Sequence, residues 1–356
     1  MKKVFIIIFC FFMLKSPVFA ISASSYIVMD MDSGKVFSES SSNSKHLIAS
    51  TSKIMTCIIA IENGDLNKKI TADKDILKAV GSSIYIEIGE QMTLKDLLYG
   101  MMMRSGNDAS VLIAKAISGS MENFASLMND YAKKIGMKNS FFYNSHGLEE
   151  KDGNGNTSTA YDMALLTSYA MKNKTFQKIF KTQKYTAKSD KKTYVWNSKN
   201  KLLKYDFITG GKTGYTIKAH RTLVTTGIIN GINTVIVTLN DGNDWQDHLS
   251  LYDYVKDNYI NYKVISKDTF KIVDSIIYGN DKLYIKNDVD TLLKIGEEKF
   301  INVKYVLYSD KNYRNNTKVG NIEVYLNNKL INKEPIYVEM QKNKKTFKNF
   351  LKNLFK

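Results

Sequence analysis

Apolar and polar residues change their spacing several times along the chain. Residues 25–30 and 34–38 have the pattern of two short strands, and the turn between them predicts a hairpin. The spacing then becomes helical, and we expect helices that begin at Ser50, Thr93, Asn107 and Thr159, with an amphipathic helix over 124–135. Strand spacing returns at 207–214, 221–229 and 234–239, around Asn230-Gly231, and a last helix covers 244–259.

This order predicts a mixed α/β domain over residues 21–260. Its mainly antiparallel sheet takes strands from both ends of the segment, and the helices cluster between them. From 264 to 340 no helical period appears, which predicts a small all-β domain with strands at 271–273, 282–285, 300–307 and 321–326.

Both ends of the chain differ from the body. Residues 1–20 have a basic start, an unbroken apolar run and small residues at the end, so we interpret them as a secretory signal peptide. An uncleaved N-terminal anchor is the alternative. Residues 341–356 hold six lysines, and their Phe and Leu residues fall on one helical face, which predicts an amphipathic membrane-anchor helix. A disordered basic tail that binds wall polymers is the alternative.

Charge and cysteine content narrow the possible partners and chemistry. The net charge is +16, which for an exported protein favours anionic lipid and wall polymers, and no motif indicates nucleic acid. Cys10 lies in the signal peptide, so Cys57 is the single mature cysteine and excludes an intramolecular disulfide. Because Cys57 lies in an apolar stretch, we expect a buried, inert thiol.

The first chemical motif is Ser50-Thr51-Ser52-Lys53. At the start of a helix this spacing places Ser50 and Lys53 on one face, one turn apart. A neutral lysine amine can take the proton of a serine hydroxyl, and burial or a nearby cation keeps lysine neutral. The backbone N–H of Ser50 is a candidate oxyanion donor. A capping serine beside a surface lysine would have the same spacing.

Two later motifs supply the remaining parts of a serine-lysine hydrolase. In Ser105-Gly106-Asn107, between two predicted helices, the hydroxyl can pass a proton to a leaving amine and the amide can bind the acyl side. In Lys212-Thr213-Gly214 the cation and the hydroxyl suit a carboxylate, and glycine admits substrate backbone. Each motif alone also fits a plain turn. Together and in this order, they predict one active site.

With these motifs the chain resembles the low-molecular-mass penicillin-binding proteins, which are serine D-alanyl-D-alanine carboxypeptidases, in their Gram-positive, especially clostridial, form. Similar segments extend along nearly the whole mature chain, at 93–108, 146–148, 157–164, 210–216 and 321–327. The resemblance implies a penicilloyl-serine-transferase fold and removal of the terminal D-alanine from peptidoglycan pentapeptide stems. It also implies acylation of Ser50 by β-lactams, no cofactor or metal, and a location at the outer face of the cytoplasmic membrane or in the cell wall.

The resemblance assigns a role to each motif residue. Ser50 is the nucleophile, Lys53 the base, Ser105 and Asn107 the relay, and Lys212, Thr213 and Gly214 form the substrate-binding strand. The chain departs from the family at His220, which stands where a glycine is usual and leaves substrate preference open. The other histidines are scattered, and we interpret His46, His146 and His248 as structural.

Several activities stay open on this pattern. A β-lactamase needs rapid hydrolysis of its acyl intermediate, often through a glutamate, and Glu149 and Glu150 follow His146-Gly147-Leu148. A transpeptidase or DD-endopeptidase would use the same groups. A non-catalytic penicillin- or wall-binding module is the alternative from another class, and the intact motifs argue against it.

Overall fold

The computed structural model describes residues 21–341, apart from 79, 273–276, 280 and 310–311. They divide into two compact units. The first comprises the described residues up to Gly227 and Thr234–Tyr252, and the second comprises Ile228–Asn233 and the described residues from Asp253 onward. The expected signal peptide and, except for Gln341, the expected anchor helix lie outside the described residues.

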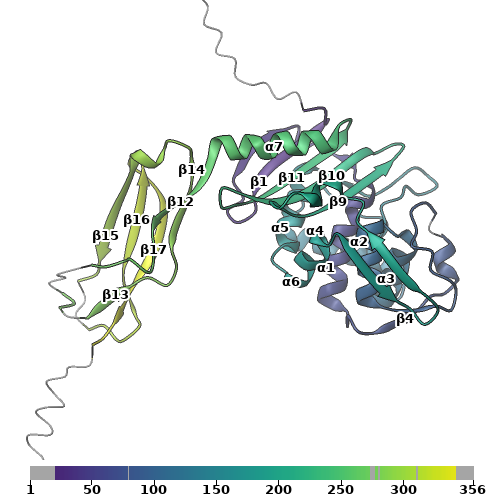
Figure 1. The fold of residues 1–356 in the computed structure, drawn as a ribbon, viewed down its shortest axis with the longest axis horizontal. Helices are drawn as coiled ribbons and strands as arrows, with labels where there is room; N and C mark the ends of the chain where they lie inside the picture. Colours follow the sequence, from purple (N-terminus) through teal and green to yellow (C-terminus); the bar gives the residue numbers. More distant parts are fainter. Residues whose placement is uncertain (1–20, 79, 273–276, 280, 310–311, 342–356) are drawn as a thin grey trace, which may run out of the picture. The chain divides into compact units, whose positions relative to one another are not determined.

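The first unit contains a five-stranded sheet with the order β2-β1-β11-β10-β9 (Figure 1). β1 is antiparallel to β2 and to β11, and β9 is antiparallel to β10. The expected hairpins and the expected mixing of strands from both ends are confirmed, and β9 forms an edge of the sheet. The strands are β1 (Ser25–Asp30), β2 (Val36–Ser40), β9 (Ile208–Thr216), β10 (His220–Ile229) and β11 (Ile232–Asp241).

The predicted helices are confirmed, with small changes at their ends. The side chain of Thr93 accepts a hydrogen bond from the Asp96 amide at 3.1 Å and so caps α2. The helices are α1 (Lys53–Asn63), α2 (Leu94–Arg104), α3 (Asn107–Ser118), α4 (Met121–Ile135), α5 (Ala160–Ala170), α6 (Lys174–Lys181) and α7 (Asp244–Asn258). The short 3-10 helices are η1 (Ala49–Ser52), η2 (Lys74–Lys78), η3 (Lys201–Lys204) and η4 (Glu298–Phe300).

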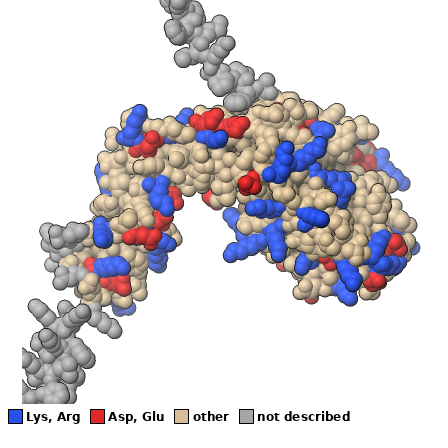
Figure 2. All heavy atoms as spheres, in the orientation of Figure 1, with Lys and Arg blue, Asp and Glu red and all other residues tan. Residues whose placement is uncertain are grey.

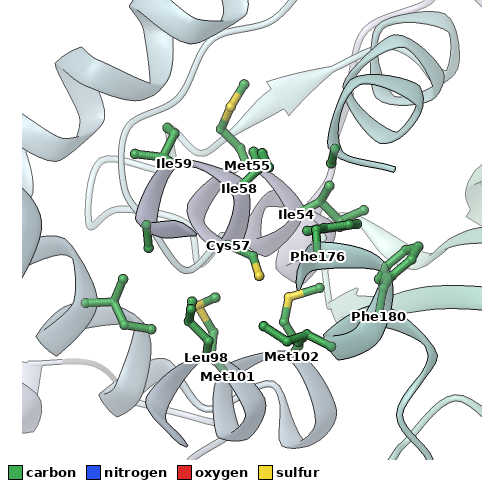
Figure 3. Close-up of a cluster of buried hydrophobic side chains, with 14 of the residues drawn as sticks. Ile54, Met55, Cys57, Ile58, Ile59, Leu98, Met101, Met102, Phe176 and Phe180 are labelled. Atoms are coloured by element: carbon green, nitrogen blue, oxygen red, sulfur yellow. The ribbon is translucent and has the colours of Figure 1, made fainter. Parts of the chain in front are cut away.

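Helix α1 lies in the middle of the hydrophobic core. Its residues from Lys53 to Ala60 are all buried, and Figure 3 shows Cys57 among side chains from α2 and α6. Burial raises the pKa of the Cys57 thiol, so the prediction of an inert, buried cysteine is confirmed. A helix enclosed in this way holds the residues at its first turn in fixed positions.

Three two-stranded pairs complete the first unit. The sequence did not predict the β7-β8 hairpin, nor helix α6 before it. The pairs are β3 (His46–Leu47) with β6 (Thr157–Ser158), β4 (Lys69–Thr71) with β5 (Gln91–Thr93), and β7 (Lys184–Lys188) with β8 (Thr193–Asn197).

The second unit contains two antiparallel sheets, a two-stranded one and a four-stranded one with the order β13-β17-β16-β15. Ile322, Val324, Ile336 and Val338 form the centre of its core. The all-β character is confirmed, but the strand predicted at 271–273 is wrong for 271–272, which form no strand, and 273 is not described. The strands are β12 (Tyr259–Ile265), β13 (Lys282–Tyr284), β14 (Val289–Lys294), β15 (Ile301–Leu307), β16 (Lys318–Leu326) and β17 (Lys329–Glu339).

Candidate active site

Ser50 and Lys53 meet at the junction of η1 and α1. The sequence predicted one helix from Ser50, but Ser50 lies in the 3-10 turn and the α-helix begins at Lys53. The three-residue spacing still brings Lys53 Nζ to 3.0 Å from Ser50 Oγ. Ala49, just before the pair, has a φ of +45°, a strained value for a residue with a side chain.

Lys53 is completely buried, and polar atoms surround its amine on three sides. Nζ lies 2.7 Å from Asn107 Oδ1 and 2.6 Å from the carbonyl oxygen of His146, in addition to its contact with Ser50. A neutral amine has two N–H bonds and one lone pair. With the amide and carbonyl oxygens accepting the two N–H groups, the lone pair faces the hydroxyl of Ser50, which is the geometry of a general base.

Electrostatics favour this neutral form. Burial lowers the pKa of Lys53 well below its usual value, and the positive charges of Lys212 and Lys199 lower it further. The carboxylate of Asp108 acts in the opposite direction with a smaller effect. No carboxylate forms an ion pair with Lys53 among the described residues, so the effects that lower its pKa prevail.

The loop between α2 and α3 carries Ser105 and Asn107 to Lys53. Ser105 ends α2 with a φ of +62°, a left-handed conformation that residues other than glycine seldom adopt. Asn107 begins α3, and its Nδ2 donates to the carbonyl of Val80 at 2.6 Å. That contact orients the amide, so Oδ1 faces Lys53.

Asp108 fixes the neighbouring segment. Its buried carboxylate accepts hydrogen bonds from the Ser83 hydroxyl and from the backbone amides of Ile84 and Ile86. Asn107 N in turn donates to Ser82 O at 2.7 Å. The residues that follow Ser105 therefore hold each other and the 82–86 segment in place.

Strand β9 brings the third motif to the same point. Lys212 is buried, and its Nζ lies 3.2 Å from Ser105 Oγ and 2.6 Å from the carbonyl oxygen of Thr213. Thr213 is partly exposed at the sheet edge. A Cβ on Gly214 would lie 3.0 Å from the backbone nitrogen of Ser50 and 2.3 Å from Thr222 Oγ1, so only glycine fits there.

Burial and the charge of Lys199 lower the pKa of Lys212 to about 7. Near neutral pH the free protein thus holds Lys212 as a mixture of ammonium and amine. A carboxylate placed beside it would favour the charged form. The group is consequently suited to bind an anion and to exchange a proton with Ser105.

The structure gathers Ser50, Lys53, Ser105, Asn107, Lys212, Thr213 and Gly214 around one centre, as the motif order predicted. Sequence reasoning missed two contributors. The carbonyl oxygen of His146 contacts Lys53. The charge of Lys199, whose Nζ lies 3.0 Å from Ser82 Oγ, lowers the pKa of both Lys53 and Lys212. A backbone carbonyl has no side-chain signature, and Lys199 is one of many lysines in its segment.

The histidine side chains play other parts. Burial, with the charge of Lys53, lowers the pKa of His146 to about 3, so its ring is neutral and its Nδ1 accepts from the amide of Leu148 at 3.2 Å. His248 is fully buried between the hydroxyls of Thr225 and Thr238. His220 is exposed with a φ of +54°, a backbone conformation that glycine adopts more readily than histidine.

A cavity of about 590 Å³ lies beside two of the residues that contact the motif side chains, although none of the seven motif residues lines it. Its wall includes Val80, whose carbonyl oxygen accepts from Asn107, and His146, whose carbonyl oxygen accepts from Lys53. Glu149 and Glu150 also line it. Glu149 accepts a hydrogen bond from Thr216 and Glu150 accepts one from Asn144, so both carboxylates are engaged. In the part of the chain that the structure describes, no His, Cys, Asp and Glu residues form a metal-binding group.

Comparison with known proteins identifies the family of each unit. Residues 12–243 match the family model of D-alanyl-D-alanine carboxypeptidases, and residues 259–344 match that of the penicillin-binding protein 5 C-terminal domain. The chain is 39% identical to D-alanyl-D-alanine carboxypeptidase DacF of Bacillus subtilis over 205 residues, which cover 55% of this chain and 52% of that protein. It is 29% identical to DacC of Escherichia coli over 90% of this chain and 84% of that protein.

Solved structures show the same fold. A D-alanyl-D-alanine carboxypeptidase of Mycobacterium tuberculosis has a TM-score of 0.62 at 30% identity, over 65% of this chain and 90% of its own. Penicillin-binding protein 5 of Haemophilus influenzae has a TM-score of 0.70 at 24% identity, over 90% of this chain and 97% of its own. The second likeness supports the fold of both units.

Proposed function

The chain belongs to the D-alanyl-D-alanine carboxypeptidase family of low-molecular-mass penicillin-binding proteins, and from that premise we propose that Ser50 is its nucleophile toward peptidoglycan pentapeptide stems. As a D-alanyl-D-alanine carboxypeptidase, the enzyme must break the bond before the terminal D-alanine. The single observation that carries the residue assignment is the 3.0 Å contact between Ser50 Oγ and the buried amine of Lys53.

In the first half of the proposed reaction, Ser50 Oγ attacks the carbonyl carbon of the penultimate D-alanine. Lys53 Nζ takes the hydroxyl proton, and the backbone N–H of Ser50 stabilises the negative charge that forms on the carbonyl oxygen. The amide of Asn107 binds the acyl side. Its contact with Val80 keeps this group oriented before substrate arrives.

The leaving amine needs a proton, and Ser105 is placed to deliver it. Ser105 Oγ lies 3.2 Å from Lys212 Nζ, so the hydroxyl can give its proton to the amine and recover one from the two lysines. The proton that Lys53 took from Ser50 thus leaves with D-alanine, and Lys53 is a neutral base again. The departing D-alanine keeps its carboxylate beside Lys212 and Thr213. Water then attacks the acyl ester, Lys53 accepts its proton, and Ser50 regains the hydrogen as the shortened stem is released.

β-Lactams imitate the D-alanyl-D-alanine end and acylate Ser50 in the same way. Fast release of that acyl group, as in a β-lactamase, often uses a carboxylate that is free to activate water beside the ester. The hydrogen bonds of Glu149 with Thr216 and of Glu150 with Asn144 provide no such base. We expect a stable penicilloyl enzyme and, in a steady-state nitrocefin assay, slow turnover.

The deciding experiment follows pentapeptide muropeptide by mass spectrometry and labels the enzyme with a fluorescent penicillin. Wild type should release one alanine and become labelled, whereas Ser50→Ala should do neither. Ser52→Ala is the matched control, because the Ser52 hydroxyl donates to the carbonyl of Ala49 and faces no catalytic group. Labelling that survives in Ser50→Ala would refute the assignment.

The domain boundaries proposed are 21–260 for the catalytic domain and 264–340 for the β-rich domain. The 1–20 signal peptide and the 341–356 anchor complete the chain, and both lie outside the described residues except for Gln341. No helix of the described ranges has the length and apolar character needed to cross a membrane. The six lysines and the Phe and Leu face of 341–356 support an interfacial anchor at an anionic surface.

Two measurements test this part of the proposal. N-terminal sequencing of exported protein should begin close to residue 21. Deletion of 341–356 should move active enzyme from washed membranes to the soluble fraction and leave turnover of a soluble pentapeptide unchanged. Truncated protein that still sediments with membranes would contradict the anchor.

A further inference from the structure

A concentration of positive charge lies beside the active site. Residues 172–204 contain eleven lysines and one acidic residue, Asp190. Lys191 and Lys192 approach Glu87, but the other nine lysines form no ion pair with any carboxylate of the described residues. Figure 2 shows Lys and Arg side chains gathered over the region where Figure 1 labels α5 and α6. An excess of this kind is unlike the mixed charges of an ordinary surface.

The fold brings five of these lysines together from three elements. Gln183 lies at their centre, because its carbonyl accepts from Ser198 N at 2.8 Å and its Nε2 donates to Leu203 O at 2.6 Å. These two bonds join the end of α6 and the start of β7 to the segment that leads into η3. The lysines around this junction are exposed, and we name them the basic junction: Lys181, Lys184, Lys199, Lys201 and Lys204.

The basic junction extends to the catalytic groups. Lys199 N donates to Met103 O at 3.1 Å, near the end of α2, and Lys199 Nζ contacts Ser82, which in turn holds Asn107. A ligand on the basic junction would therefore lie close to the segment that holds Asn107.

A membrane is a poor fit to this surface. Binding in a lipid headgroup region needs apolar side chains that insert. Helix α6 has such residues, but Phe176, Ile179 and Phe180 are buried, and Phe180 packs against Gly210 of β9. Of the described residues in 172–204, Val195 is the one exposed large hydrophobic residue. The surface offers charge alone.

We propose that the basic junction binds an anionic phosphodiester polymer of the cell wall and so holds the catalytic unit on the material that carries its substrate. A flexible chain of phosphates can follow lysines on separate elements, and each contact releases a bound counterion. With about five contacts, the affinity should fall on the order of a hundredfold between 50 and 200 mM salt.

The test measures binding of full-length protein to poly(glycerol phosphate), and separately to phosphatidylglycerol and phosphatidylcholine vesicles. The variant Lys181→Glu, Lys184→Glu, Lys201→Glu, Lys204→Glu leaves Lys199 intact. The matched control has the same change of net charge in the second unit, at the exposed residues Lys271, Lys294, Lys318 and Lys329. All three proteins keep residues 341–356, so any contribution of this tail is common to them.

We expect the first variant to lose at least tenfold in polymer affinity while its vesicle binding and its turnover of soluble pentapeptide match wild type, which also shows that it folds. The control should bind polymer within a few fold of wild type. Equal losses in both variants would show that net charge alone is responsible and overturn the proposal. A loss confined to phosphatidylglycerol vesicles would assign the surface to the membrane and overturn it as well.

Discussion

Replacement of Asn107 by aspartate tests whether Lys53 acts as a neutral base. The change places a negative charge where the amide oxygen lies 2.7 Å from Lys53 Nζ. An opposite charge at this range raises the pKa of a lysine by about 1 to 3 units, which is about 1.4 to 4 kcal/mol. Two such charges 4 Å apart attract by about 4 kcal/mol at an effective dielectric constant of 20, which agrees with the upper value.

The sign of the effect follows from the role of the amine. A base must be unprotonated, so kcat/KM rises with pH through the pKa of Lys53 in the free enzyme. The rising part of this pH profile is its acid limb, and a raised pKa of Lys53 moves it to higher pH. At a fixed pH on the limb, the aspartate variant should be about ten to a thousand times slower than an enzyme in which only the amide contacts are lost.

Asn107→Leu supplies that comparison, because it removes the same hydrogen bonds without adding charge. The assay is the rate of acylation by a chromogenic β-lactam between pH 5 and 10, measured for wild type and both variants. Acid limbs of the two variants that coincide would refute the reasoning, since Lys53 would then not be the group whose deprotonation permits attack.

Three further predictions concern the other lysines and the strand edge. Lys199→Met should move the acid limb to higher pH by less than one pH unit, because it removes an exposed positive charge that lowers the pKa of Lys53. Lys199→Arg should restore the wild-type pH profile. The KM for substrate should rise above pH 7, because free Lys212, with its pKa of about 7, loses its charge there. Lys212→Ala should raise KM at pH 6 and remove this pH dependence. An unchanged KM would contradict the role of Lys212 in binding the carboxylate. Gly214→Ala should lower penicillin acylation at least a hundredfold and also lower the melting temperature, because its Cβ would overlap the buried Thr222 and approach the nitrogen of Ser50.

The sequence predicted those parts of the molecule that depend on side-chain type and local spacing. The Ser50 and Lys53 pair, the Thr93 cap and the Asn230-Gly231 turn each follow from a short segment, so they could be recognised without a structure. Helix α6 was missed because lysines lie among its three apolar residues, and its apolar face is explained only by its packing against β9.

Other features depend on contacts between distant segments. The His146 carbonyl reaches Lys53 across ninety-three positions of sequence, and any residue type has a carbonyl. Lys199 affects the site through its position beside Ser82, over a hundred residues earlier in the chain. The strand predicted at 271–273 had suitable residues, but no neighbouring strand pairs with 271–272.

The pairing of β1 with β11 has a consequence for the order in which the enzyme assembles. Ser25 lies opposite Leu239, so the sheet cannot close until nearly the whole first unit has been synthesised. Contacts of such long range are slow to form. Ser50 and Lys53 are synthesised early, but β9, which supplies Lys212, follows about 160 residues later. Until then the growing chain lacks one of the two buried lysines of the site, so we expect β-lactams to react only with completed molecules.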